Sequence, residues 1–118
     1  MKKNLRWSTP GSYPGNPAYA DGVIFAANNE TLMLEARKEA DGTLIWSWTA
    51  PSDARSFNSD VLVTNNLIFV STATTTYAID RTTHGSVWSY KASGKLAMSA
   101  NGILYIKGDT TIVAINLK

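Results

Sequence analysis

The sequence contains no cysteine, which excludes structural disulfides, thiolate metal sites and cysteine nucleophiles. Its single histidine, His84, cannot form a zinc site without cysteine or a second histidine. No P-loop or dinucleotide-binding glycine pattern occurs, and no apolar run approaches the ~18 residues that a membrane span needs. We therefore predict no catalytic residue, no cofactor site, no metal site and no membrane span, and the sequence gives no positive sign of an enzyme.

The charge of the chain is low and evenly distributed. The 118 residues include 11 Lys+Arg and 9 Asp+Glu, which gives a formal net charge of +2. The basic residues are spread along the chain, whereas nucleic-acid-binding proteins gather them into a patch or stripe. We therefore do not expect nucleic acid as a partner. The length fits one domain or a piece of a larger one.

Short apolar runs recur three times, as "VIFAA" (23–27), "LIFVS" (67–71) and "ILYIK" (103–107). Each run follows a pair of turn residues and precedes a polar loop, which is the pattern of a β-hairpin. The repeat returns after about 40 residues, and four short antiparallel strands in such an interval are typical of a propeller blade. The sequence therefore predicts an all-β chain of about three β-propeller blades, forming a partial or oligomer-completed propeller.

The repeat also sets the expected boundaries within a single segment, 1–118. Two blades are predicted over 16–50 and 60–92, an incomplete third blade over 95–118, and a separate outer strand over 4–10. The charged stretch 34–41 has helical propensity, but it aligns with 76–83 in the next copy. We therefore expect a strand that runs into a turn there.

A longer phrase is written twice, from Ala36 to Trp46 and from Ala78 to Trp88, with a glycine before the last apolar run. This phrase resembles the tryptophan-docking motif of quinoprotein-like (PQQ-like) β-propellers. WD40 and kelch repeats are the next alternatives, but their Trp-Asp and double-glycine signatures are absent. The resemblance implies a spacer, in which a small alanine makes room for an indole from the neighbouring blade. The implied docking residues are Trp7, Ala36, Gly42, Trp46, Ala78, Gly85, Trp88 and Ala114.

Three blades are too few for a closed ring, because propellers normally have 4–8. The chain is then either a segment of a longer propeller or one part of a ring that several chains complete. Two chains head to tail would give about six blades, with each N-terminal strand closing the last blade of its partner. We therefore expect a protein partner or self-association.

The longest loops are expected on one face of the propeller, where repeat proteins often bind their partners. The exposed candidates for this binding face are Tyr13, Asn28, Asn29, Arg55, Phe57 and Asn58. The leading hypothesis is a non-catalytic scaffold that binds proteins or ligands. The alternatives are a fragment of a quinoprotein dehydrogenase, with its cofactor residues outside this chain, and a carbohydrate-binding or adhesive module. The resemblance implies a periplasmic or extracellular location by analogy alone.

Overall fold

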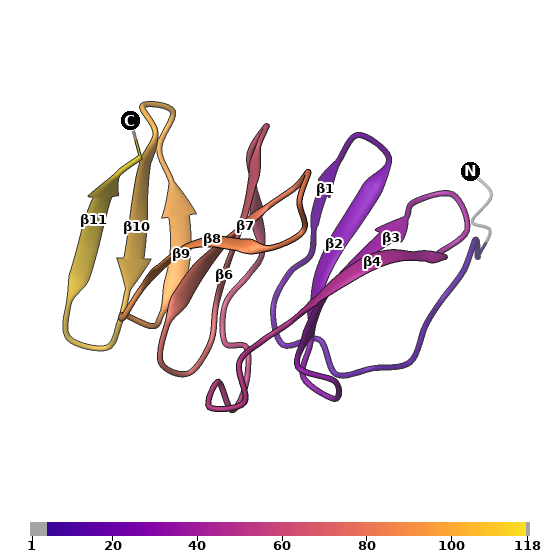
Figure 1. Cartoon of the computed structure of the whole chain (residues 1–118), viewed down its shortest axis with the longest axis horizontal. Helices are drawn as coiled ribbons and strands as arrows, with labels where there is room; N and C mark the ends of the chain where they lie inside the picture. Colours follow the sequence, from indigo (N-terminus) through magenta and orange to yellow (C-terminus); the bar gives the residue numbers. More distant parts are fainter. Residues whose placement is uncertain (1–4, 118) are drawn as a thin grey trace.

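The computed structural model describes residues 5–117 and places eleven strands in this range. The strands form three antiparallel sheets that stand side by side in chain order (Figure 1). The first blade contains β1 (Ala18–Ala20), β2 (Val23–Asn28), β3 (Met33–Lys38) and β4 (Leu44–Thr49). The second contains β5 (Leu62–Val63), β6 (Leu67–Ser71), β7 (Thr76–Asp80) and β8 (Ser86–Tyr90). The third contains β9 (Lys95–Met98), β10 (Ile103–Lys107) and β11 (Ile112–Asn116). The prediction of an all-β chain built from antiparallel sheets is confirmed.

Strand pairing explains the repeated phrase. Ala36 on β3 lies opposite Trp46 on β4, and Ala78 on β7 lies opposite Trp88 on β8. In both sheets the register shifts directly after the alanine, so one residue is inserted into the outer strand. The alanine therefore faces the indole of its own blade. The expectation that it makes room for an indole from the neighbouring blade is wrong.

The core lies between the blades, because the central strands β6 and β7 of the second blade bury both of their faces. On the second blade, Ile68, Val70 and Ile79 pack against the first blade. Their sequence neighbours Phe69 and Ala78 point to the other side and pack against Leu104 and Ile106 of the third blade. Strand side chains alternate between the two faces of a sheet, so this run must be apolar on both sides. The second blade is consequently held between two apolar interfaces.

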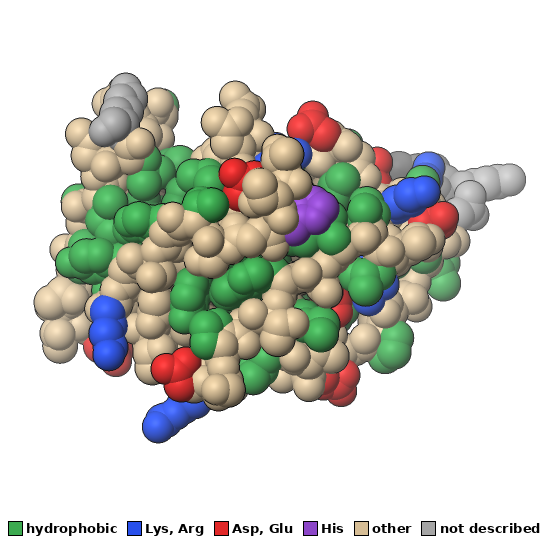
Figure 2. Space-filling view, in the orientation of Figure 1, with side chains coloured by type: hydrophobic (Ala, Val, Ile, Leu, Met, Phe, Trp, Pro, Cys, Tyr) green, Lys and Arg blue, Asp and Glu red, His purple; other side chains and the backbone are tan. Residues whose placement is uncertain are grey.

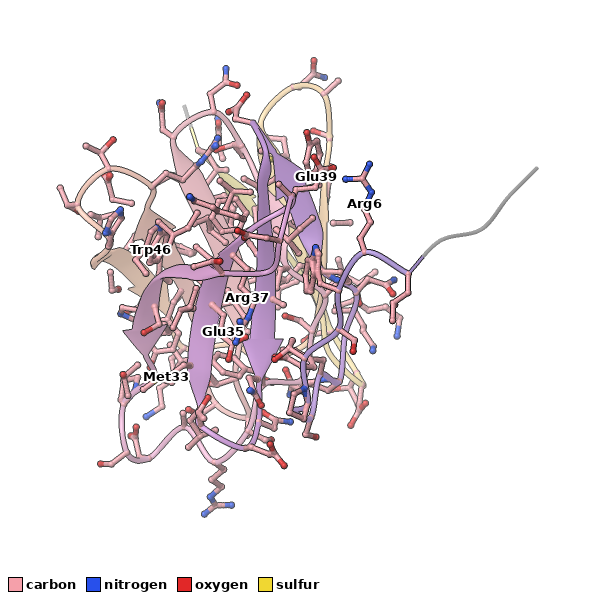
Figure 3. All side chains as sticks on the ribbon, turned by 90° about the vertical axis from the view of Figure 1, so that its right-hand side faces the viewer. Arg6, Met33, Glu35, Arg37, Glu39 and Trp46 are labelled. Atoms are coloured by element: carbon pink, nitrogen blue, oxygen red, sulfur yellow. The ribbon has the colours of Figure 1, made fainter. Side chains whose placement is uncertain are left out.

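The separate outer strand that the sequence predicts over 4–10 is absent from the part of it that the structure describes. Residues 5–10 have no regular secondary structure, and residue 4 lies outside the described range. A strand at this place needs the open edge of another sheet, and the first blade already carries β4 on its outer edge. Residues 5–17 instead run along the first blade, as the view onto that end shows (Figure 3).

Candidate functional site

The turn between β3 and β4 has the same backbone hydrogen bonds as the turn between β7 and β8. The N–H of Gly42 donates to the carbonyl of Lys38 at 2.9 Å, and the N–H of His84 donates to the carbonyl of Asp80 at 2.8 Å. Both donors have left-handed backbones, with φ of 78° at Gly42 and 67° at His84. His84, not Gly85, therefore stands in the place of Gly42. Gly42 comes six residues after Ala36, whereas Gly85 comes seven residues after Ala78, because His84 has the turn position in the second copy.

Each of these turns receives a tryptophan. Trp7 lies against Gly42, where an added Cβ would be only 2.6 Å from the indole ring. Its Nε1–H donates to the carbonyl of Glu39 at 2.7 Å. Trp46 stacks on the imidazole of His84, with ring centroids 4.1 Å apart and planes 7° apart. Trp46 on the outer strand of the first blade thus rests on the turn of the second blade, and Trp7 from the N-terminal segment rests on the turn of the first.

Trp88 has the same place in the second blade, but its surroundings differ. It contacts Phe69 and Tyr90, with ring centroids 6.5 and 6.2 Å away. Together with residues at the end of β11 it lines a cavity of about 260 Å³. Counting from Ala114, the turn that corresponds to 38–43 begins at Asn116, so most of it lies beyond the described residues. Trp88 therefore borders a cavity, whereas Trp46 contacts a turn.

The first blade faces away from the second with Ile24, Ala26, Glu35 and Arg37, which we call the N-terminal open face. At the corresponding two positions of β3, the second blade has Tyr77 and Ile79 and the third has Val113 and Ile115. An ion pair thus replaces two apolar side chains here. Glu35 and Arg37 lie side by side on β3 in Figure 3.

Glu35 is 5% exposed, and both oxygens of its carboxylate accept hydrogen bonds. Its Oε1 accepts from the Tyr13 hydroxyl at 2.8 Å and from Arg37 Nε at 3.0 Å, and its Oε2 accepts from Asn28 Nδ2 at 3.0 Å. Burial alone would raise the pKa of Glu35, but the hydrogen bonds from Arg37, Asn28 and Tyr13 outweigh it and hold that pKa below its ordinary value. Burial and the bond to Glu35 raise the pKa of Tyr13.

A cavity of about 250 Å³ lies over this network. Trp7, Thr9 and Tyr13 line it from the N-terminal segment, and Ile24 and Ala26 line it from β2. The cavity is therefore mainly apolar, with the Glu35–Arg37 pair at one end. It marks the space between the N-terminal segment and the first blade.

The opposite end of the molecule has a second open face. On the side of the third blade that points away from the second, Ala97, Tyr105, Ile112 and Ala114 form the C-terminal open face, with Lys95 and Lys107 on the same side. Ile112 is 69% exposed and Tyr105 is 37% exposed. Hydrophobic side chains gather over β10 and β11 at the left of Figure 2. Within residues 5–117, no strand pairs with the outer edge of β11.

The structure does not place all six loop candidates on an exposed face. Phe57 is 1% exposed and Asn28 is 4% exposed, so their expected exposure is wrong. Phe57 forms a bridge with Thr72 and enters the core between the first two blades. Asn28 points toward Glu35 instead of toward solvent.

Three of the other four candidates form hydrogen bonds to distant parts of the chain. The Asn29 side chain accepts from the Phe57 N–H at 2.7 Å and donates to its carbonyl at 3.3 Å. Tyr13 is half-buried against Glu35, and the exposed Asn58 donates to Ser93 Oγ at 2.8 Å. Arg55 is exposed. The structure thus joins Tyr13 and Asn28 through Glu35, and Asn29 to Phe57, and leaves Arg55 apart.

Sequence reasoning missed three residues of these sites: Glu35, Arg37 and His84. Aligning the three copies at Ala36, Ala78 and Ala114 would have revealed Glu35 and Arg37, because charged residues then stand beside apolar ones. Among the described residues, no three acidic or histidine side chains could together hold a metal ion. That part of the chain also has no helix long and apolar enough to cross a membrane.

The three sheets and the tryptophan contacts between them define a β-propeller segment of the PQQ-like type. The family model described as outer membrane protein assembly factor BamB matches residues 3–117, and the chain belongs to this family. No protein with a curated function matches the chain. The resemblance to PQQ-like propellers is confirmed.

Solved structures show the same fold at low sequence identity. BamB from Moraxella catarrhalis has a TM-score of 0.73 and 13% identity, with 95% of this chain and 36% of that chain covered. The computationally designed Ika4 protein has a TM-score of 0.74 and 13% identity, with 99% and 74% covered. Quinohemoprotein alcohol dehydrogenase from Comamonas testosteroni has a TM-score of 0.64 and 17% identity, with 81% and 17% covered. The chain thus spans about a third of the length of that BamB.

Proposed function

We propose that this chain is a non-catalytic interaction scaffold, a propeller segment that binds protein through the two open faces at its ends. The partner completes the propeller, and self-association head to tail is one form that this completion takes. The family is named for an assembly factor of outer membrane proteins, which favours an interaction role over a catalytic one.

One observation carries the proposal: Trp7 rests on the first turn as Trp46 rests on the second. The N-terminal segment therefore occupies the place of an outer strand from a preceding blade. At the other end, β11 presents an unpaired edge within the described residues, beside the exposed Ile112. Open sheet edges and apolar patches of this kind are where proteins associate.

The test combines a solution mass with partner capture. The 12.8 kDa chain is studied by size exclusion with light scattering and is also used as bait, with bound proteins identified by mass spectrometry. Ile112→Lys places a charge on the C-terminal open face, and Val87→Lys places one on an exposed strand position away from both open faces. We expect assembly or a defined partner that Ile112→Lys removes and Val87→Lys retains. If neither assembly nor a partner sensitive to Ile112→Lys is found, the scaffold proposal fails.

A further inference from the structure

We infer that the partner is a second copy of this chain, and that residues 5–10 of each copy form the fourth strand of the third blade of the other. This inference rests on the proposed scaffold function and names its partner. It assigns a strand-addition site to the outer edge of β11 and a matching strand to the N-terminal segment.

Within residues 5–117 the third blade has three strands, and the other two blades show where a fourth strand would pair. The first and second blades each carry an outer strand, β4 beside β3 and β8 beside β7. In the third blade β11 has the place of β3 and β7, because Tyr105 pairs with Ala114 as Phe25 pairs with Ala36. A fourth strand of this blade therefore belongs on the outer edge of β11.

The N-terminal segment is the part of the second copy that supplies this fourth strand. Trp7 makes the contact that outer-strand tryptophans make, yet residues 5–10 pair with no sheet among the described residues. Its position is that of the outer strand of a blade ahead of the first one. A second copy would bring this unpaired segment to the edge of β11, and its own β11 would accept the same segment of the first copy.

The repeat predicts the register of this pairing. Trp46 lies opposite Ala36, and Trp48 lies opposite Leu34. Applied to the new strand, this register sets Trp7 opposite Ala114 of the second copy and Thr9 opposite its Ile112. Ala36 is fully buried at its equivalent position, whereas Ala114 is exposed in the single chain. Pairing would cover Ala114 and Ile112 together.

The geometry also favours two copies. Two chains of three sheets make six blades, which lies within the usual range of 4–8 for a closed ring, whereas three chains exceed it. In this arrangement the C-terminal open face of one copy lies over the N-terminal open face of the other. The cavity of about 250 Å³ beside Trp7 is then filled by side chains of the second copy.

The absence of native cysteine allows a direct test by disulfide trapping. Thr9→Cys and Ile112→Cys chains are purified separately, mixed and oxidised. Directly opposed residues in a sheet have Cβ atoms about 4.5–5.5 Å apart, close to what a disulfide needs. We expect a covalent species of twice 12.8 kDa from the mixture and none from either variant alone. The control mixture pairs Thr9→Cys with Tyr105→Cys, which is on the same face but on the central strand β10.

The outcomes separate this inference from the proposed function. Equal trapping in the control mixture, or a dimer by light scattering without Thr9–Ile112 trapping, overturns the strand addition and leaves the scaffold proposal standing. If the chain is monomeric and binds a different protein at the open faces, the strand addition is likewise overturned and the scaffold proposal stands. A second variant, Thr9→Pro, changes a surface segment and removes a ladder hydrogen bond donor. We expect it to lower the fraction of dimer by at least tenfold, and an unchanged dimer would contradict the inference.

Discussion

Replacing Gly42 by alanine tests the contact between Trp7 and the first turn, and Gly22 provides a matched control. Both glycines have φ of 78°, so an alanine at either position meets the same left-handed strain, on the order of 1 kcal/mol. Around Gly22, no described atom lies within 4 Å of an added Cβ. At Gly42 that Cβ would be 2.6 and 2.7 Å from two indole carbons of Trp7, so the ring must move.

The displaced indole would lose its contact with the turn and its hydrogen bond to Glu39. Overpacking typically costs about 1–3 kcal/mol, and a hydrogen bond contributes about 0.5–1.5 kcal/mol. We therefore expect Gly22→Ala to lower the free energy of unfolding by about 1 kcal/mol and Gly42→Ala by about 2.5–5.5 kcal/mol.

Urea denaturation followed by circular dichroism, at one fixed protein concentration, measures the difference. The same two glycine variants are then compared in a Trp7→Ala background. There the extra cost of Gly42→Ala should disappear, because the clashing ring is gone. Equal losses for the two glycines in the native background would refute the docking of Trp7 on this turn.

Three further outcomes follow from the same contacts. Trp46→Ala should lower the free energy of unfolding by about 3 kcal/mol, and Trp88→Ala by less, since only Trp46 rests on a following turn; urea denaturation compares them. His84→Gly should stay within about 1 kcal/mol of the native chain in thermal unfolding, because relief of backbone strain offsets the lost stacking on Trp46. His84→Ala keeps the strain and should be less stable than His84→Gly; the reverse order would contradict the assignment. The pKa of Glu35 is lowered in the folded chain, so its stabilisation is present above the ordinary value of 4.5 and is lost as pH falls through the folded pKa. Thermal melts at pH 7 and pH 3 should therefore show a smaller acid-induced loss for Glu35→Gln than for the native chain or the exposed Glu30→Gln.

Most of the fold could be predicted because local signals agree with one another. The turn pairs before β2 and β10 lie where the hairpins reverse, and at Asp21 and Gly22 the backbone is left-handed as such turns require. The stretch 34–41 shows where propensity alone would have failed. Its residues favour a helix, but Leu34 and Ala36 are buried beside the second blade, and only alternation along a strand places them there.

The candidate site was less predictable because its contacts are long-range. Phe57 lies in a polar loop whose composition suggests exposure, and its burial depends on Asn29 and Thr72 from other parts of the chain. Composition likewise cannot show that Asn28 turns toward Glu35. The strand expected over 4–10 fails for a different reason. A strand exists only beside an edge that it can join, and a single copy offers none at this place.

The two open faces differ in a way that gives the proposed association a direction. The C-terminal open face exposes Ile112 beside a strand edge with no partner among the described residues. Covering it therefore takes apolar side chains and a strand that can pair with β11. The N-terminal open face carries Glu35 and Arg37, which already have their hydrogen bonds. Two N-terminal open faces together would leave the exposed Ile112 and the neighbouring strand edge of both copies uncovered. Two C-terminal open faces together would leave residues 5–10 of both copies without an edge. Only unlike faces bring residues 5–10 of one copy to the edge of β11 at Ile112 and Ala114 of the other, so the proposed contact is head to tail.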